Sequence, residues 1–138
     1  MIYSERFSIS TEGECQIVDL SEKIRKTVAK SKIRDGLACV FIPGATGAIT
    51  TVEYEPGLLK DLPAALERLF PKGIEYAHHQ TWHDWNGHSH VRASMIGPSI
   101  TIPIIKGDLQ LGTWQQVVFI ELDIHPRRRE IVVQLVGE

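Results

Sequence analysis

Five of the six histidines lie between His78 and His90, in the run HHQTWHDWNGHSH. Neutral imidazoles are common zinc ligands, and three of them plus a water give a tetrahedral ion with one open position. An ion with an open position can act as a Lewis acid. An ion whose four positions are all filled by protein ligands only stabilises the fold. The segment therefore predicts a site for a divalent metal, Zn²⁺ in the first place and Mg²⁺ in the second.

The spacing of the histidines indicates which of them would bind the metal. His88 and His90 are separated by one residue in a segment that we expect to be a strand, so their side chains would leave the same face. His78 ends the preceding predicted strand, and the loop between could bring it back beside them. His78, His88 and His90 are the expected ligands. The alternative is a polar loop whose imidazoles form only local hydrogen bonds.

Three further residues could complete this site. Asn86 opens a tight Asn-Gly turn, and its amide could reach the same pocket. Asp84 could accept the second ring N–H of a ligand imidazole. Glu53 becomes a general base or a fourth ligand if its strand faces the histidines. The alternative for Glu53 is a solvated carboxylate.

The elements that must position these residues follow from periodicity. Alternating and β-branched segments predict a mostly antiparallel sheet structure, and two amphipathic segments predict helices. One helix follows Asp19 and carries Ile24 and Val28 on one face, and the other carries Leu58, Leu62, Leu66 and Leu69. Strands are expected at 1–9, 15–18, 37–42, 47–54, 74–79, 88–96, 99–105, 114–123 and 130–136. The fold class is α+β.

Two charged or glycine-rich segments lie outside this pattern. Arg127, Arg128 and Arg129 are expected on a solvated hairpin. The loop Gly44–Gly47 could approach a phosphate through its backbone N–H groups, but it lacks the lysine of a P-loop.

Length and composition restrict the class of protein. The chain has 138 residues, a formal net charge of −2 and 43% hydrophobic residues, which predicts a single domain over 1–138. We expect neither a nucleic-acid nor a membrane partner, because no basic excess and no long apolar run is present. Two cysteines outside any C-x-x-C pair and no apolar signal region predict a cytoplasmic protein.

Several long strings resemble one family. NGHSHVRASMIGPSITIP, GDLQLGTWQQ, PRRREIVVQLVGE and, upstream, FIPGATGAITTVEYEPG are similar in order and spacing to the YjbQ family, whose members are widely labelled secondary thiamine-phosphate synthase. The resemblance covers most of the chain. It implies an α+β fold with β-sandwich character, and a homotrimer with sites near the subunit junctions.

The resemblance also implies a polar pocket built from Glu53, His78, Asn86 and His90. The family often has histidine where this chain has Gly44, so one possible ligand or acid–base group is missing, and His88 could compensate. The family's label implies that an aminopyrimidine diphosphate is joined to a thiazole phosphate with release of pyrophosphate. Arg92 and the metal would then stabilise the leaving group.

Three functions follow as hypotheses. The first is a metal-assisted transferase that acts on a small phosphorylated molecule, with Glu53, Asn86 and Arg92 as catalytic residues. The second is a zinc-dependent hydrolase in which a bound hydroxide attacks a phosphoester or an amide. The third is a non-catalytic trimer that binds a metal or a small anion.

Overall fold

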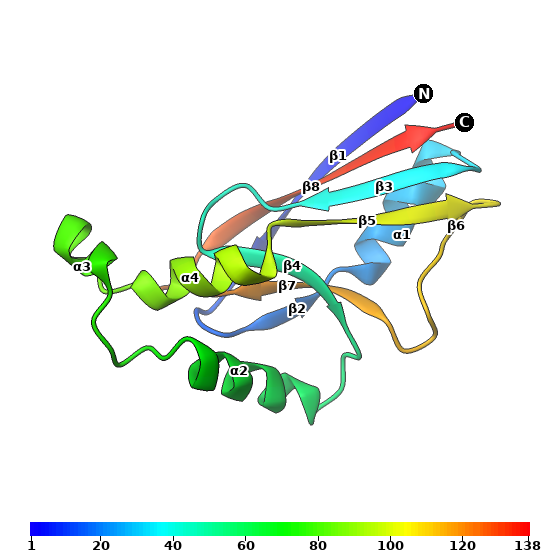
Figure 1. Ribbon diagram of the computed structural model, residues 1–138. Helices are drawn as coiled ribbons and strands as arrows, with labels where there is room; N and C mark the ends of the chain where they lie inside the picture. The colour runs from blue at the N-terminus through cyan, green and yellow to red at the C-terminus, as the bar shows by residue number, and fades with distance from the viewer.

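Two antiparallel β-sheets pack face to face in the computed structural model, which describes residues 1–138 (Figure 1). The larger sheet has the strand order β1-β8-β3-β5-β6, and the smaller has the order β2-β7-β4. The strands are β1 (Ile2–Ser10), β2 (Ile17–Asp19), β3 (Gly36–Phe41), β4 (Gly47–Val52), β5 (Ser99–Ile105), β6 (Asp108–Leu109), β7 (Gln116–Glu121) and β8 (Arg128–Gly137). The helices are α1 (Ser21–Ser31), α2 (Leu58–Leu69), α3 (Ala77–Trp82) and α4 (Gly87–Ile96). The predicted α+β class and its sandwich character are confirmed.

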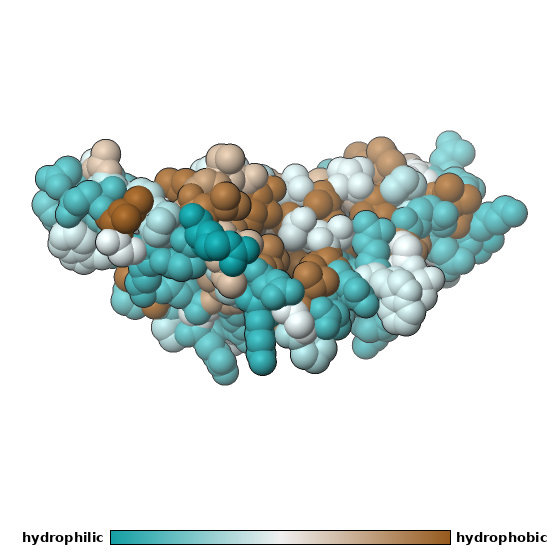
Figure 2. Space-filling view, turned by 60° about the horizontal axis from the view of Figure 1, so that its bottom comes forward, coloured by the Kyte–Doolittle hydropathy of each residue, from teal (hydrophilic) through white to brown (hydrophobic).

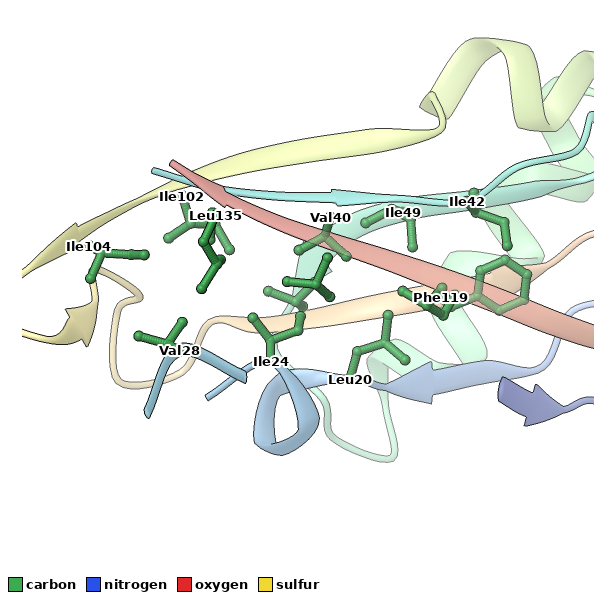
Figure 3. Close-up of a cluster of buried hydrophobic side chains, with 14 of the residues drawn as sticks. Leu20, Ile24, Val28, Val40, Ile42, Ile49, Ile102, Ile104, Phe119 and Leu135 are labelled. Carbon is green, nitrogen blue, oxygen red and sulfur yellow. The ribbon is translucent and has the colours of Figure 1, made fainter. Parts of the chain in front are cut away.

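The main core lies between the two sheets and α1. Strand β8 shows why: Ile131, Val133 and Leu135 alternate with exposed or half-buried residues, so one face of the strand is apolar. Facing side chains come from β3, β4, β5 and β7, and α1 closes the side with Ile24 and Val28 (Figure 3). All of these side chains are almost fully buried. The two sheets are therefore held together by a continuous apolar layer.

A second core covers the other face of the small sheet. Val118 and Ile120 of β7 point away from the main core and pack with Leu66 of α2 and Ala93 of α4. Helix α4 lies along β4 (Figure 1). In contrast, α3 projects from one end of the elongated molecule, where the space-filling view shows hydrophilic and apolar side chains together (Figure 2). The small sheet thus carries α4, which holds His88 and His90, and α3 contacts α4.

Two of the predicted strands are wrong. Residues 74–79 contain the start of α3, and residues 88–96 form most of α4. Hydrophobic periodicity did not identify α4 as a helix, because the buried side of this helix is mainly polar or small. Its buried residues are Gly87, His88, Ser89, Arg92 and Ala93. The apolar alternation of Val91, Ala93 and Met95 therefore imitated a strand.

The outer face of the five-stranded sheet is left uncovered. Cross-strand neighbours Leu37 and Val136 are 51% and 50% exposed, and Ile2, paired with Val136, is 68% exposed. Phe41 lies four residues after Leu37 on β3, on the same face of the sheet, and is 40% exposed. Apolar side chains therefore occupy adjacent strands of one open face.

No helix of the fold is both long enough and apolar enough to span a bilayer.

Candidate functional site

Four polar side chains meet where α3 is connected to α4. The rings of His78 from α3 and His90 from α4 lie with their centroids 4.3 Å apart. His78 Nε2 is 3.0 Å from Asp84 Oδ1 and 3.0 Å from Asn86 Oδ1. Asn86 is the N-cap residue of α4, so the start of this helix fixes its position. We call His78, Asp84, Asn86 and His90 the histidine cluster.

The orientation of the Asn86 amide decides how the cluster is hydrogen-bonded. With its nitrogen toward Asp123, the amide oxygen faces the carboxylate of Asp84 as well as His78. In the opposite orientation the nitrogen donates to both Asp84 oxygens, at 2.8 and 3.1 Å, and to His78 Nε2 at 3.0 Å. The second orientation therefore gives the amide nitrogen an acceptor at each of these contacts. A cation bound between Asp84 and His78 would need the first orientation, in which the amide oxygen faces both residues.

A buried carboxylate anchors the cluster to the small sheet. Asp123, just beyond β7, is 1% exposed and its Oδ1 lies 3.4 Å from Asn86 Nδ2. Its Oδ2 accepts hydrogen bonds from Thr46 and, twice, from the guanidinium of Arg127. Burial would raise the pKa of Asp123, but bonds from the Ile124 N–H and from Arg127 hold it below its ordinary value. Asp123 is therefore ionised and places a half-exposed cation, Arg127, next to the cluster.

The prediction that all three arginines decorate a solvated hairpin is wrong for Arg129. This side chain is buried and donates to both oxygens of Glu121, at 2.9 and 2.5 Å, and to Thr46. Glu121 is 0% exposed and accepts a further bond from Thr11. Two carboxylates at alternate positions, Glu121 and Asp123, at the end of a buried strand were the sequence signal for these pairs, since buried charges require partners.

Burial also affects the histidine of α4 that faces the cluster. It lowers the pKa of His90, and the neighbouring His78 lowers it further, while Asp84 and Asp123 act in the opposite direction. The ring of His90 is therefore neutral at pH 7. A neutral imidazole has a free lone pair, which is the form that binds a metal or accepts a proton.

His88 lies apart from the histidine cluster. Two residues along an α-helix are separated by about 200°, so His88 and His90 leave nearly opposite sides of α4. His88 is 0% exposed, and its Nε2 lies 2.7 Å from Glu14 Oε2, while the other oxygen of Glu14 pairs with Lys72. The structure therefore brings together only two of the three histidines expected to bind one metal.

The pairing of Glu14 predicts a pH-dependent contribution to stability. Burial opposes ionisation of Glu14, but Lys72 and His88 outweigh it, so the pKa lies below 4.5. A lowered carboxyl pKa stabilises the fold at pH values above 4.5, and this contribution is lost as the pH falls through the folded-state pKa. Glu14→Gln should therefore lower the melting temperature at pH 7, and the difference from the unmodified protein should shrink toward pH 3. If the melting temperatures of the variant and the unmodified protein differed equally at pH 7 and pH 3, this account would be contradicted.

Two other predicted residues also lie away from the cluster. Arg92 is 3% exposed and engaged by Glu67, by the carbonyl of Phe70 and by Cys15, so it ties α4 to the end of α2. Glu53 is exposed just after β4, whereas the cluster lies near the Gly47 end of that strand. A strand of this length separates the two places by about 20 Å. Glu53 cannot reach the cluster within one chain.

The donor set can be compared with what a metal requires. No three His, Cys, Asp or Glu side chains lie close enough together to hold an ion. A metal site here therefore needs the amide oxygen of Asn86 as well as His78 and Asp84. Nitrogen and oxygen donors of this kind fit Zn²⁺ or Mn²⁺ better than an all-oxygen set would, and they bind Mg²⁺ less well.

Comparison with known proteins decides the family. Residues 5–138 match the model of the family described as UPF0047 protein YjbQ-like. The chain belongs to the YjbQ family. A UPF0047 protein of Methanothermobacter thermautotrophicus is 36% identical over 137 residues, which is 99% of this chain and 94% of that protein. Another, from Archaeoglobus fulgidus, is 35% identical and covers 92% and 96% of the two chains.

Solved YjbQ-like structures share the fold closely. A protein of unknown function from Sulfolobus solfataricus superposes with a TM-score of 0.94 at 30% identity and covers 100% of this chain and 99% of its own. A hypothetical protein from Aeropyrum pernix gives 0.91 at 32% identity, with 98% of each chain covered. The YjbQ fold is therefore common to this chain and to relatives whose function is described as unknown.

Gly44, the position at which the family resemblance implies a missing histidine, lies on the β3–β4 loop. Its φ is +118°, a backbone conformation that side chains rarely adopt, and an added Cβ would lie 3.3 Å from Arg129 Nη1. The same loop presents Thr46 to Asp123 and Arg129. In this chain the loop therefore supports the buried ion pairs.

Proposed function

We propose that this protein is a metal-assisted enzyme that acts on a small phosphorylated molecule at the histidine cluster. The observation that carries the proposal is the meeting of His78 Nε2, the Asp84 carboxylate and the Asn86 amide within about 3 Å of one another. These atoms would hold a divalent cation, with His90 as the adjacent neutral imidazole. The cation would supply positive charge at a leaving phosphate.

The residues around the cluster suit a phosphorylated ligand. Arg127 is half exposed and is held by Asp123 beside Asn86, so its remaining N–H groups could contact phosphate oxygens. Asp123 restricts the guanidinium to one place, which reduces the entropy lost when an anion binds. Arg127 takes the role that Arg92 was expected to play, because Arg92 is buried against α2.

The transferase that the family label implies is the first reaction to test. In that reaction the thiazole nitrogen forms a bond to the methylene carbon of the aminopyrimidine, the bond from that carbon to the diphosphate oxygen breaks, and pyrophosphate leaves with the electron pair. The chain's own part is to align the two rings and to neutralise the leaving group through Arg127. We place this activity in the cytoplasm, which agrees with two unpaired cysteines.

A homotrimer would complete the site. Glu53 lies on the far end of β4 from the cluster, so Glu53 of the partner subunit is the one that could contribute a carboxylate. The uncovered sheet face around Leu37, Phe41 and Val136 provides an apolar surface for self-association. The site would then lie at a subunit junction.

The enzyme assay uses the two phosphorylated precursors with Zn²⁺ or Mg²⁺ added. Thiamine phosphate and pyrophosphate should form in equal amounts, and His90→Ala should reduce the rate by at least about 100-fold. Generic phosphoesters and amides are assayed in parallel. Their cleavage without product synthesis would replace the transferase by a hydrolase, and no turnover with tight metal retention would leave a binding protein.

The oligomer has a test of its own. Leu37→Glu places a charge in the middle of the uncovered face, and burying it at an interface would cost several kcal/mol. Light scattering should then show a trimer for the unmodified protein and a monomer for the variant. Leu69→Glu is the control, because Leu69 is 68% exposed at the end of α2 and lies outside this sheet. A monomeric unmodified protein would contradict the proposal.

A further inference from the structure

A pocket of about 560 Å³ lies beside the histidine cluster, and none of its lining residues belongs to that cluster. Its lining comes from the segment before α3, from α3 itself and from the α3–α4 connection. The lining residues are Lys72, Gly73, Ile74, Glu75, His79 and Trp85. The volume is in the range of sites that bind small organic molecules.

One wall of the pocket is an aromatic platform. The ring of Trp85 lies with its centroid 4.9 Å from that of His79, and Tyr76 lies edge-on to His79 at 5.6 Å. His79 is 4% exposed, whereas Trp85 is 59% exposed. The indole therefore packs on the His79 ring and still has surface available to a ligand, which favours stacking of a planar ring.

The buried histidine offers one defined polar group at this wall. His79 Nε2 accepts a hydrogen bond from the backbone N–H of Gly87 at 3.1 Å, so in the neutral ring the proton is on Nδ1. No acceptor of the chain lies within hydrogen-bond distance of this N–H, and the nitrogen is not fully buried. Because His79 lines the pocket, its free N–H is available to an acceptor on a ligand.

The backbone is built to hold this arrangement. A Cβ at Gly87 would lie 2.5 Å from Tyr76 Cβ and 3.1 Å from His79 Nε2, so only glycine permits the close packing. His83 and Trp85 both have positive φ, 57° and 58°, in the left-handed region that is unusual for bulky residues. Strained conformations of this kind concentrate at binding sites.

We propose that this pocket binds a planar heteroaromatic ring, stacked on Trp85, through a ring nitrogen or carbonyl that accepts the His79 Nδ1–H. A saturated ring of the same size would lose the stacking contact. A charged group on the ligand would meet both a cation, Lys72, and a carboxylate, Glu75, at the rim. The ring is therefore expected to be uncharged.

The test is a titration of the intact ¹⁵N-labelled protein with 2-aminopyrimidine, followed by NMR. The chain has three tryptophans, so three indole N–H signals are expected. They are assigned from Trp85→Leu and Trp82→Leu, each of which removes one signal. The indole signal of Trp85 should shift and saturate in the millimolar range, and cyclohexanol should shift none of the three.

The two variants also form a matched pair for affinity, followed through backbone signals near the pocket. Trp82 is 70% exposed on the same segment but does not line the pocket. Trp85→Leu should weaken binding about tenfold, since stacking on an aromatic side chain contributes in this range, and Trp82→Leu should leave it unchanged. No saturable shift of the Trp85 signal, equal binding of cyclohexanol, or equal weakening in both variants would overturn the proposal.

Discussion

Replacing Arg129 with methionine should lower the free energy of unfolding by about 3–5 kcal/mol, because the carboxylate of Glu121 is left buried without its cation. Glu121 is 0% exposed, and after the change its remaining hydrogen bonds come from Thr11 and from the backbone N–H of Asp123. Methionine retains much of the packing volume, so the loss reports mainly on the ion pair. Urea denaturation at pH 7 measures the change.

Arg128→Met is the matched control for this experiment. Arg128 is exposed, and its one side-chain hydrogen bond is to Ser8 at 3.3 Å. Its replacement should change the free energy of unfolding by less than about 0.5 kcal/mol. If the two variants were equally stable, Arg129 would be a solvated residue after all, and the buried ionic support of Thr46 and the β3–β4 loop would be disproved.

Replacing His78 with alanine should weaken the binding of Zn²⁺ by about 100-fold or more. Loss of a residue that only supports a ligand costs about 10- to 100-fold in metal affinity, and a direct ligand contributes more. His78 is 25% exposed on α3, so its removal should not unfold the protein. Calorimetric titration at pH 7.5 with the variant and the unmodified protein gives the ratio.

The same titration separates this site from the three-histidine site. His88→Gln should leave the Zn²⁺ affinity unchanged, because His88 is bonded to Glu14 on the other side of α4. His83→Ala, at an exposed position on the α3–α4 connection, controls for general loss of imidazole. A loss in His88→Gln as large as in His78→Ala would show that both histidines bind the same ion.

The sheet structure was predictable from the chain because its strands bury one face. Alternation in 130–136 and the leucine spacing in 58–69 identified β8 and α2, since each has a single apolar side. The structure brings His78, Asn86 and His90 of the histidine-rich run together, and their role as a functional centre stays a prediction. Family resemblance added the sandwich architecture, and comparison confirmed the family.

The errors share one physical origin. Helix α4 packs through His88, Ser89 and Arg92, whose burial depends on tertiary partners such as Glu14 and Glu67 that are distant in sequence. No local pattern reports such partners. Once α4 is a helix and not a strand, the faces of His88 and His90 separate. The burial of Arg129 could not be predicted for the same reason, because its partners are Glu121 and Thr46 of the β3–β4 loop.

The most direct test of the metal proposal is a crystal grown with Zn²⁺, with anomalous diffraction recorded at the zinc absorption edge. The account predicts an anomalous peak about 2 Å from His78 Nε2, with the Asp84 carboxylate and the Asn86 amide oxygen completing the coordination. A peak between His88 and Glu14, or no peak near His78 at saturating Zn²⁺, would contradict it.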